Sequence, residues 1–163
     1  MNKILNWDEL FMSMAILFSR RSKDPSTQVG AVIVSPSNNV LGCGYNGMVS
    51  IENNDEKFPW FKDAENYEDQ KYLYVVHSEV NAIINAQGKD LTGSTIYVTL
   101  FPCNECAKLI VQSKIKKVVY LSDKYSGYIN FSSSRTILEK CNIELVHYVP
   151  EMKELVINYD GYL

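Results

Sequence analysis

The sequence has no long apolar segment and few cysteines. None of its 163 residues lies in a run approaching the roughly 20 apolar residues that a membrane-spanning helix needs. The N-terminus lacks the basic region and apolar segment of a secretion signal. The four cysteines are too few for a disulfide scaffold, and Cys103 and Cys106 form a Cys-x-x-Cys pair, which in a reducing compartment indicates metal or redox chemistry. We therefore expect a soluble, cytoplasmic protein with no membrane partner.

Basic residues are not concentrated in any part of the chain. The 16 Lys and Arg residues are dispersed and are outnumbered by 19 Asp and Glu residues, which gives a net charge of -3. Proteins that bind the phosphate backbone of nucleic acids usually present a clustered basic surface. We therefore expect no polymeric nucleic acid among the partners.

The hydrophobic pattern predicts a single α/β domain over residues 1–163. With 46% hydrophobic residues, the chain has enough apolar material for one substantial core. Apolar residues recur at helical spacing from Trp7 to Phe18, and Asn6 followed by Glu9 resembles a capping box. The other predicted elements are a β-hairpin at 29–34 and 40–45, helices at 78–86, 104–112 and 133–140, and strands at 94–99, 117–121 and 143–148.

The order of these elements predicts the architecture. The hairpin strands pair antiparallel, whereas strands that alternate with helices pair in parallel through right-handed crossovers. We predict a three-layer α/β/α sandwich around a mixed five-stranded sheet. Residues 46–74 are polar, acidic and aromatic without periodicity, and a loop of this length is usually functional, so we interpret it as a lid or specificity insertion. Residues 150–163 are too short for a second domain and form a C-terminal tail.

Two short motifs carry candidate metal ligands. A His-Ser-Glu motif beginning at His77 opens one predicted helix, and a Pro-Cys-Asn-Glu-Cys motif opens the next. Its cysteines, Cys103 and Cys106, are three residues apart in a first helical turn, so both sulfurs face one side. One imidazole and two thiolates fill three positions of a tetrahedral Zn2+ ion and leave the fourth for water, whose pKa the ion lowers toward about 7. Glu79 is then placed to act as the general base.

Each motif has another interpretation when it is taken alone. A Cys-x-x-Cys pair is typical of a structural zinc site or a redox pair, and a histidine at a helix start is usually a cap or core residue. A structural zinc site needs a fourth protein ligand, but Cys43, Cys141 and His147 lie in or beside predicted core elements, where packing explains them. A redox pair does not account for His77 and Glu79. The combination favours a catalytic zinc site.

The order His-x-Glu followed by Pro-Cys-x-x-Cys is the signature of zinc-dependent nucleobase deaminases. Beyond this signature, the chain resembles the deoxycytidylate (dCMP) deaminases from about Leu17 to Tyr125. The shared segments are 21–25, 28–31, 44–47, 59–60, 64–66, 76–83, 100–108 and 122–125. The resemblance implies that the chain hydrolyses dCMP to dUMP and ammonia, which supplies the precursor of dTMP. Glu79 would protonate N3 of cytosine, and a second proton would release the amino group.

The resemblance also implies substrate residues. Asn46 matches the asparagine with which the family contacts the deoxyribose 3'-hydroxyl, although its position before a glycine also suits a simple turn residue. Tyr125 matches an aromatic position that lies against the nucleotide, and a half-buried surface aromatic is the alternative. Loop chemistry makes Lys23 and Ser26 candidates for contact with the 5'-phosphate.

The turn formed by Gly44, Tyr45, Asn46 and Gly47 resembles the effector region of the family. Many members are hexamers that dCTP activates and dTTP inhibits. The resemblance therefore implies a homohexamer with dCTP and dTTP as effectors and dCMP as the small-molecule substrate.

Two other functions fit parts of the same pattern. A tRNA adenosine deaminase shares the metal chemistry, but we expect such an enzyme to present a basic surface and a short loop in place of residues 46–74. A noncatalytic protein could keep zinc for stability and serve as a binding module. Glu79 argues against this last function, because zinc does not need it as a ligand.

Overall fold

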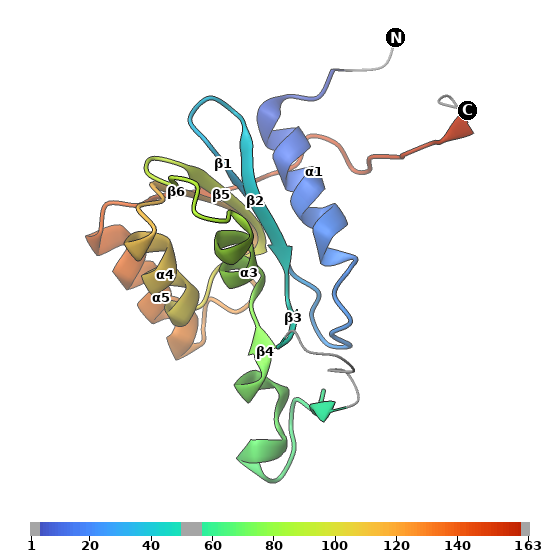
Figure 1. The fold of residues 1–163 in the computed structure, drawn as a ribbon, viewed down its shortest axis with the longest axis vertical. Coiled ribbons are helices and arrows are strands. Elements are labelled where there is room, and N and C mark those ends of the chain that lie inside the picture. Colours follow the sequence, from blue (N-terminus) through green and yellow to red (C-terminus); the bar gives the residue numbers. More distant parts are fainter. Residues whose placement is uncertain (1–3, 50–56, 161–163) are drawn as a thin grey trace.

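The computed structural model describes residues 4–49 and 57–160, and a mixed five-stranded sheet lies at its centre (Figure 1). The strands follow the order β2-β1-β5-β6-β7. β1 pairs antiparallel with both β2 and β5, whereas β5, β6 and β7 are parallel. Their bounds are Gly30–Val34 (β1), Val40–Tyr45 (β2), Thr95–Leu100 (β5), Lys117–Ser122 (β6) and Glu144–His147 (β7). The predicted sheet is confirmed.

Helices cover both faces of the sheet (Figure 1). Side chains alternate between the two faces of a strand. Val32 of β1 therefore packs with Phe11 in one buried cluster, whereas Ala31 and Ile33 pack with Ala82 in another. The helices are α1 (Trp7–Ser19) on the first face and α3 (Ser78–Asn85), α4 (Asn104–Gln112) and α5 (Ile129–Lys140) on the second. This arrangement is the predicted three-layer sandwich.

α1 begins with the capping box that the sequence predicts. The Asn6 side chain accepts a hydrogen bond from the Glu9 backbone N–H at 2.8 Å, and the Glu9 carboxylate accepts from the Asn6 N–H at 2.9 Å. In the same first turn, Asp8 accepts a hydrogen bond from the Tyr97 hydroxyl at 2.6 Å, so α1 is attached to β5. These contacts hold the N-terminal end of α1 against the sheet.

α5 starts four residues earlier than the predicted 133–140. Its first residue is Ile129, so Ser132, which precedes the predicted start, lies inside the helix. The hydroxyls of Ser132 and Ser133 donate back to the Ile129 carbonyl at 3.1 and 2.7 Å. Because serine side chains can satisfy helix carbonyls in this way, a serine cluster does not fix a helix start.

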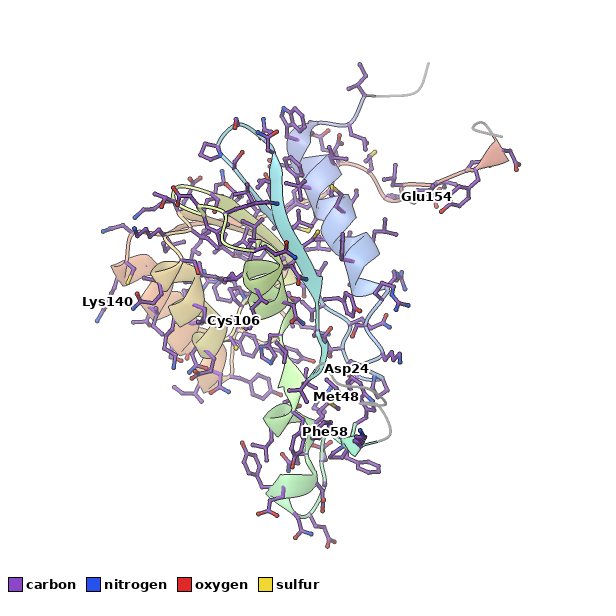
Figure 2. The ribbon with its side chains drawn as sticks, viewed as in Figure 1. Asp24, Met48, Phe58, Cys106, Lys140 and Glu154 are labelled. Atoms are coloured by element: carbon purple, nitrogen blue, oxygen red, sulfur yellow. The ribbon has the colours of Figure 1, made fainter. Side chains whose placement is uncertain are left out.

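A small second sheet connects the main sheet to the insertion, and the sequence did not predict it. β3 (Gly47–Met48) pairs antiparallel with β4 (Val75–Val76). Between them lie two 3-10 turns, η1 (Tyr67–Asp69) and η2 (Lys71–Leu73). Asp24, Met48 and Phe58 lie at this end of the molecule (Figure 2). Residues 50–56 of the predicted lid lie outside the described residues, so the lid interpretation stays a prediction.

The C-terminal tail has no helix or strand between residues 148 and 158, and it runs from β7 past α1 (Figure 1). The last three residues of the predicted tail, 161–163, lie outside the described part of the chain. Among the described helices, none is long and apolar enough to cross a membrane.

Two glycines of β2 let α3 lie directly against the sheet. A methyl group at Gly42 would overlap the Ala82 carbonyl oxygen, and one at Gly44 would lie 2.5 Å from the Ala82 nitrogen and 2.6 Å from the Ser78 oxygen. Both neighbours are backbone atoms of α3, which a side-chain movement cannot clear. The glycines therefore set the distance between β2 and the helix that begins after His77.

Gly42→Ala should lower the free energy of unfolding by about 1–3 kcal/mol, because the added methyl forces α3 away from β2. Urea unfolding measures this change. Gly127→Ala is the matched control, because no atom lies within 4 Å of its added methyl. The control should stay within about 0.5 kcal/mol of the parent protein. Equal stability of the two variants would contradict the close packing of α3.

Candidate metal centre and the loops around it

His77 stands between β4 and α3. It is the N-cap of α3 with extended backbone angles, and its carbonyl accepts the helical hydrogen bond from the Asn81 N–H at 3.1 Å. Its side chain makes no capping hydrogen bond to the helix. The ring is therefore available to face another element.

Cys103 has the same position in α4. It is the N-cap, and its carbonyl accepts from the Ala107 N–H at 2.9 Å. Just before it, the Phe101 N–H donates to the Ser122 carbonyl at 2.8 Å, which continues the pairing of β5 with β6 to the edge of the site. Cys106 follows in the first turn of α4 and is buried.

The three predicted metal ligands come together. The sulfurs of Cys103 and Cys106 lie 3.4 and 3.3 Å from Nδ1 of His77. Their donor atoms all lie within 4.8 Å of one another, and within residues 4–49 and 57–160 this is the group of three such side chains that could hold a metal ion. One imidazole nitrogen and two sulfurs form a donor set that suits Zn2+. The residues present therefore fit the predicted cofactor.

Hydrogen bonds among these groups shift their pKa values. A bond from the Cys106 thiol, assisted by His77, lowers the pKa of Cys103 to about 4. The same bond and burial raise the pKa of Cys106. The bond with Cys103 raises the pKa of His77 to about 9, although burial opposes this rise. Two helix N-termini also favour a thiolate here. Binding of a metal ion replaces the remaining protons.

Glu79 lies next to this centre but is not one of the three donors. It is in the first turn of α3, only 4% of it is exposed, and Ser78 donates a hydrogen bond to its carboxylate at 2.9 Å. Burial raises the pKa of Glu79, an effect that the positive charge of His77 partly offsets. Because the raised pKa makes the neutral acid accessible, this carboxyl group can both accept and donate a proton.

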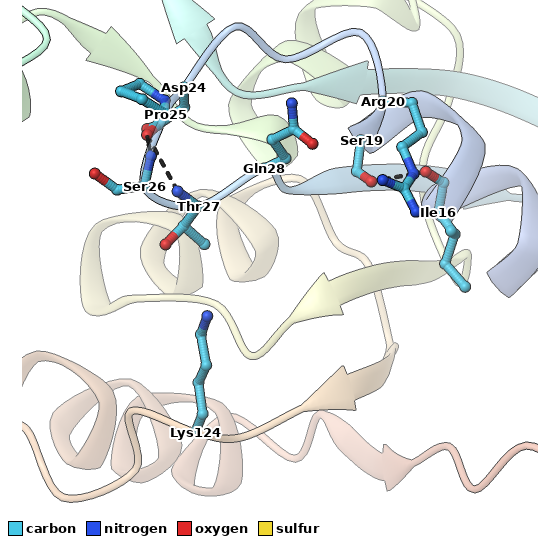
Figure 3. Close-up of a pocket in the computed structure, with 9 residues that line it drawn as sticks. All are labelled: Ile16, Ser19, Arg20, Asp24, Pro25, Ser26, Thr27, Gln28 and Lys124. Carbon is cyan, nitrogen blue, oxygen red and sulfur yellow. Dashed lines mark hydrogen bonds between the residues drawn. The ribbon is translucent and has the colours of Figure 1, made fainter.

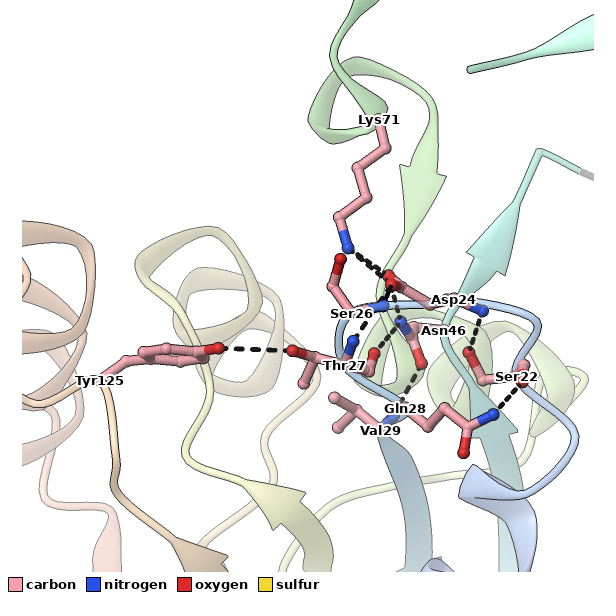
Figure 4. A network of polar contacts seen from close by, with 9 residues as sticks. All are labelled: Ser22, Asp24, Ser26, Thr27, Gln28, Val29, Asn46, Lys71 and Tyr125. Carbon is pink, nitrogen blue, oxygen red and sulfur yellow. Dashed lines mark hydrogen bonds and ion pairs between the residues drawn. The ribbon is translucent and has the colours of Figure 1, made fainter. Parts of the chain in front are cut away.

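Asn46 lies after β2 and is buried in a polar network (Figure 4). Its side-chain nitrogen donates to the Asp24 carboxylate at 3.2 Å and to the Thr27 carbonyl at 2.9 Å. Its side-chain oxygen accepts from the Val29 N–H at 2.8 Å. Both amide hydrogens are therefore used within the protein, and the oxygen retains one acceptor position.

The other substrate candidates lie around the same loop. Ser26 and Lys23 are exposed, and the Ser26 N–H donates to Asp24 at 2.8 Å. Tyr125 is half-buried, and its hydroxyl lies 3.3 Å from that of Thr27 (Figure 4). The structure thus brings Ser26, Asn46 and Tyr125 to one loop, although none of them belongs to the metal-ligand group.

An open pocket of about 560 Å³ lies beside this loop (Figure 3). It extends from the end of α1 to the loop at residues 24–28, and Arg20, Ser26 and Lys124 are among its lining residues. The three metal-ligand candidates do not line it. The pocket therefore belongs to the surroundings of the loop and is separate from the metal centre.

The effector candidates are engaged within the chain. Gly44 lies against α3, and the Tyr45 carbonyl accepts a hydrogen bond from Asn81 at 2.8 Å. Gly47 pairs with Val76. The close approach of α3 explains the glycine at position 44, and an effector role for the turn stays a prediction.

Sequence reasoning missed two residues of the polar network. Asp24 and Lys71 form an ion pair of 2.6 Å with side chains that are only 3% and 5% exposed. The position of Asp24 two residues before Ser26 was a usable signal, because Asp side chains often accept from the backbone two residues ahead. Nothing in the polar insertion distinguished Lys71 from the neighbouring charged residues.

Comparisons with known proteins agree with the donor set. The family described as cytidine and deoxycytidylate deaminase zinc-binding region matches residues 5–122. Deoxycytidylate deaminase of Homo sapiens is 45% identical over 157 residues, which cover 96% of this chain and 88% of that protein. The probable deoxycytidylate deaminase of Drosophila melanogaster is 44% identical over 164 residues, covering 97% and 80%. The crystal structure of dCMP deaminase from the cyanophage S-TIM5 in complex with dCMP and dUMP has a TM-score of 0.71 at 26% identity, covering 90% of this chain and all of that one.

Cys103→Ala should lose bound zinc and unfold at a lower temperature than the parent, because two remaining donors hold the ion weakly and zinc binding contributes to folding. Elemental analysis and calorimetry measure these changes. Cys43→Ala is the control, since Cys43 packs against the cluster under α1 on the opposite face of the sheet. Full zinc content in Cys103→Ala, or loss of zinc in Cys43→Ala, would refute the assigned ligands.

Proposed function

The chain belongs to the cytidine and deoxycytidylate deaminase family, and on this basis we propose that it hydrolyses dCMP to dUMP and ammonia. The observation that carries the proposal is the arrangement at the starts of α3 and α4. Three side chains offer one nitrogen and two sulfurs within 4.8 Å, and a buried carboxyl group, Glu79, stands beside them without being one of the donors. A purely structural zinc site does not need such a carboxyl group.

The proposed reaction assigns separate tasks to these groups. When bound by His77, Cys103 and Cys106, Zn2+ would act as a Lewis acid that makes water nucleophilic at neutral pH. Glu79 accepts a proton from the attacking water and delivers it to N3 of cytosine as C4 becomes tetrahedral. The proton that remains on the new C4 hydroxyl then passes through Glu79 to the exocyclic nitrogen, the C4–N bond breaks as the C4 carbonyl forms, and ammonia leaves. Ser78 keeps the Glu79 carboxylate oriented through its hydrogen bond.

The substrate contacts are part of the proposal. Asn46 meets the 3'-hydroxyl of the sugar, using the acceptor position that its contact with Val29 leaves open. Tyr125, whose hydroxyl lies 3.3 Å from that of Thr27, lies against the nucleotide. Lys23 and Ser26 contact the 5'-phosphate. The exposure of both supports this last assignment.

The setting of the enzyme is proposed from the family as well. In this proposal the chain forms a single domain, works in the cytoplasm as a homohexamer, and supplies dUMP for dTMP synthesis. dCTP and dTTP act as activator and inhibitor at the turn of residues 44–47. Support for these points comes from the resemblance of that turn and from the similarity to deoxycytidylate deaminases over 96% of the chain.

Ammonia release from dCMP, dCTP, deoxycytidine and cytosine tests the substrate. We expect turnover of dCMP to exceed that of the other three, because deoxycytidine and cytosine lack the phosphate and dCTP carries two more. The dCMP reaction, repeated with added dCTP or dTTP, tests regulation. Faster deamination of an adenosine in a tRNA anticodon stem-loop than of dCMP would contradict the proposed function.

Glu79→Gln should keep zinc while kcat for dCMP falls by at least about 10²–10⁴-fold, because the amide has the same shape but cannot accept and return a proton. Glu139→Gln makes the same change on the exposed side of α5 and is expected to leave kcat unchanged. Steady-state kinetics with zinc analysis measure both variants. Undiminished turnover in Glu79→Gln would remove Glu79 from the mechanism.

A further inference from the structure

The Asp24 carboxylate is the centre of a buried polar network (Figure 4). It accepts from Nζ of Lys71 at 2.6 and 2.7 Å, from the Ser26 N–H at 2.8 Å, from the Thr27 N–H at 3.1 Å and from the Asn46 amide at 3.2 Å. An ionised carboxylate offers about four acceptor sites. These donors occupy them, so the orientation of Asp24 is fully determined.

Lys71 attaches the insertion to this centre and also makes a contact within the insertion. Its ammonium group reaches Asp24, and its backbone N–H donates to the Phe61 carbonyl at 2.8 Å. Lys71 therefore links two parts of residues 57–74 to each other and connects this segment to the loop at residues 22–29. The chain then passes through β4 to His77, the first metal-ligand candidate, only six residues after Lys71.

The substrate candidates depend on the same carboxylate. Asp24 accepts one hydrogen bond from the Asn46 side-chain amide and one from the Thr27 backbone N–H. Thr27 in turn accepts the other Asn46 hydrogen on its carbonyl and contacts Tyr125 through its hydroxyl. Asn46, Ser26 and Tyr125 thus each touch Asp24 or its neighbour Thr27.

Stability alone does not explain a buried pair of charges at this position. Removing two charges from water costs energy that their attraction often only repays, and an apolar pair of similar volume is frequently as stable. What the charged pair provides is a fixed direction, because five hydrogen bonds converge on one carboxylate and all must be satisfied together.

We propose that Lys71 is a positioning residue for the proposed deamination. Its ion pair with Asp24 orders residues 57–74 against the 22–29 loop and so holds Asn46, Ser26 and Tyr125 where they meet the nucleotide. This inference rests on the proposed function. Lys71 acts through Asp24 and does not contact the reacting atoms.

Lys71→Met tests the proposal, because methionine keeps the apolar stem and removes the cation. Zinc content and kcat for dCMP should stay near those of the parent, and KM should rise about tenfold, equivalent to about 1.4 kcal/mol of binding. Hydrogen exchange should become faster in residues 57–74 and stay unchanged in residues 104–112. Lys117→Met is the matched control, since it breaks the more exposed Lys117–Glu144 pair of 3.1 Å. This control should change neither KM for dCMP nor the hydrogen exchange of residues 57–74.

The double variant Asp24→Asn with Lys71→Met separates positioning from the effect of an unpaired buried charge. We expect its KM and its exchange in residues 57–74 to stay raised, because the neutral pair cannot restore the converging bonds. The proposal would be overturned if KM and the exchange of residues 57–74 returned to parent values in the double variant. It would also be overturned if hydrogen exchange in Lys71→Met rose equally in all parts of the chain. Absence of dCMP turnover in the parent would contradict the proposed function, whereas the exchange rates would still decide whether Lys71 orders residues 57–74.

Discussion

α3 and α4 begin at the same place in the molecule, and the chemistry of the site depends on this meeting. His77 and Cys103 are both N-caps, yet neither side chain caps its helix, and instead the two groups lie 3.4 Å apart. A serine or aspartate at either position would stabilise the helix start by about 1 kcal/mol and would lose a ligand. The two helix starts thus lack the stabilisation of a capping side chain and carry metal-ligand candidates in its place. The partial positive charge of the two helix ends favours thiolate over thiol at these positions.

Backbone contacts hold the two helix starts in place. The glycines Gly42 and Gly44 allow α3 to touch β2 without intervening side chains, and the bond from Phe101 to Ser122 carries β5–β6 pairing up to the residues before Cys103. Because strand pairing and helix packing are close-packed, the starts of α3 and α4 can move little relative to the sheet. The metal-ligand geometry is therefore a property of the sheet and helices, whereas the loops around it carry the candidate substrate residues.

Two buried carboxyl groups near the site have opposite environments. Glu79 receives a hydrogen bond from Ser78, and burial raises its pKa, which suits a group that holds and releases a proton. Asp24 accepts from Lys71 and three other donors, which fix the orientation of its carboxyl group. Different surroundings thus give two residues with the same functional group different properties, and those of Glu79 suit the proton transfer proposed for it.

The sequence by itself determined features that depend on residues within about one helical turn, which are the capped start of α1 and the spacing of Cys103 and Cys106 after a proline. The order of strands and helices along the chain also determined the mixed sheet. It failed where local signals were ambiguous, as in the serine-rich start of α5, and where two-residue strands such as β3 and β4 are too short to show a pattern. Only the tertiary structure decided that Asp24 pairs with Lys71, which lies 47 positions later. The reason is physical: hydrophobic periodicity reports burial of a face, but which buried charge meets which is set by how distant segments pack.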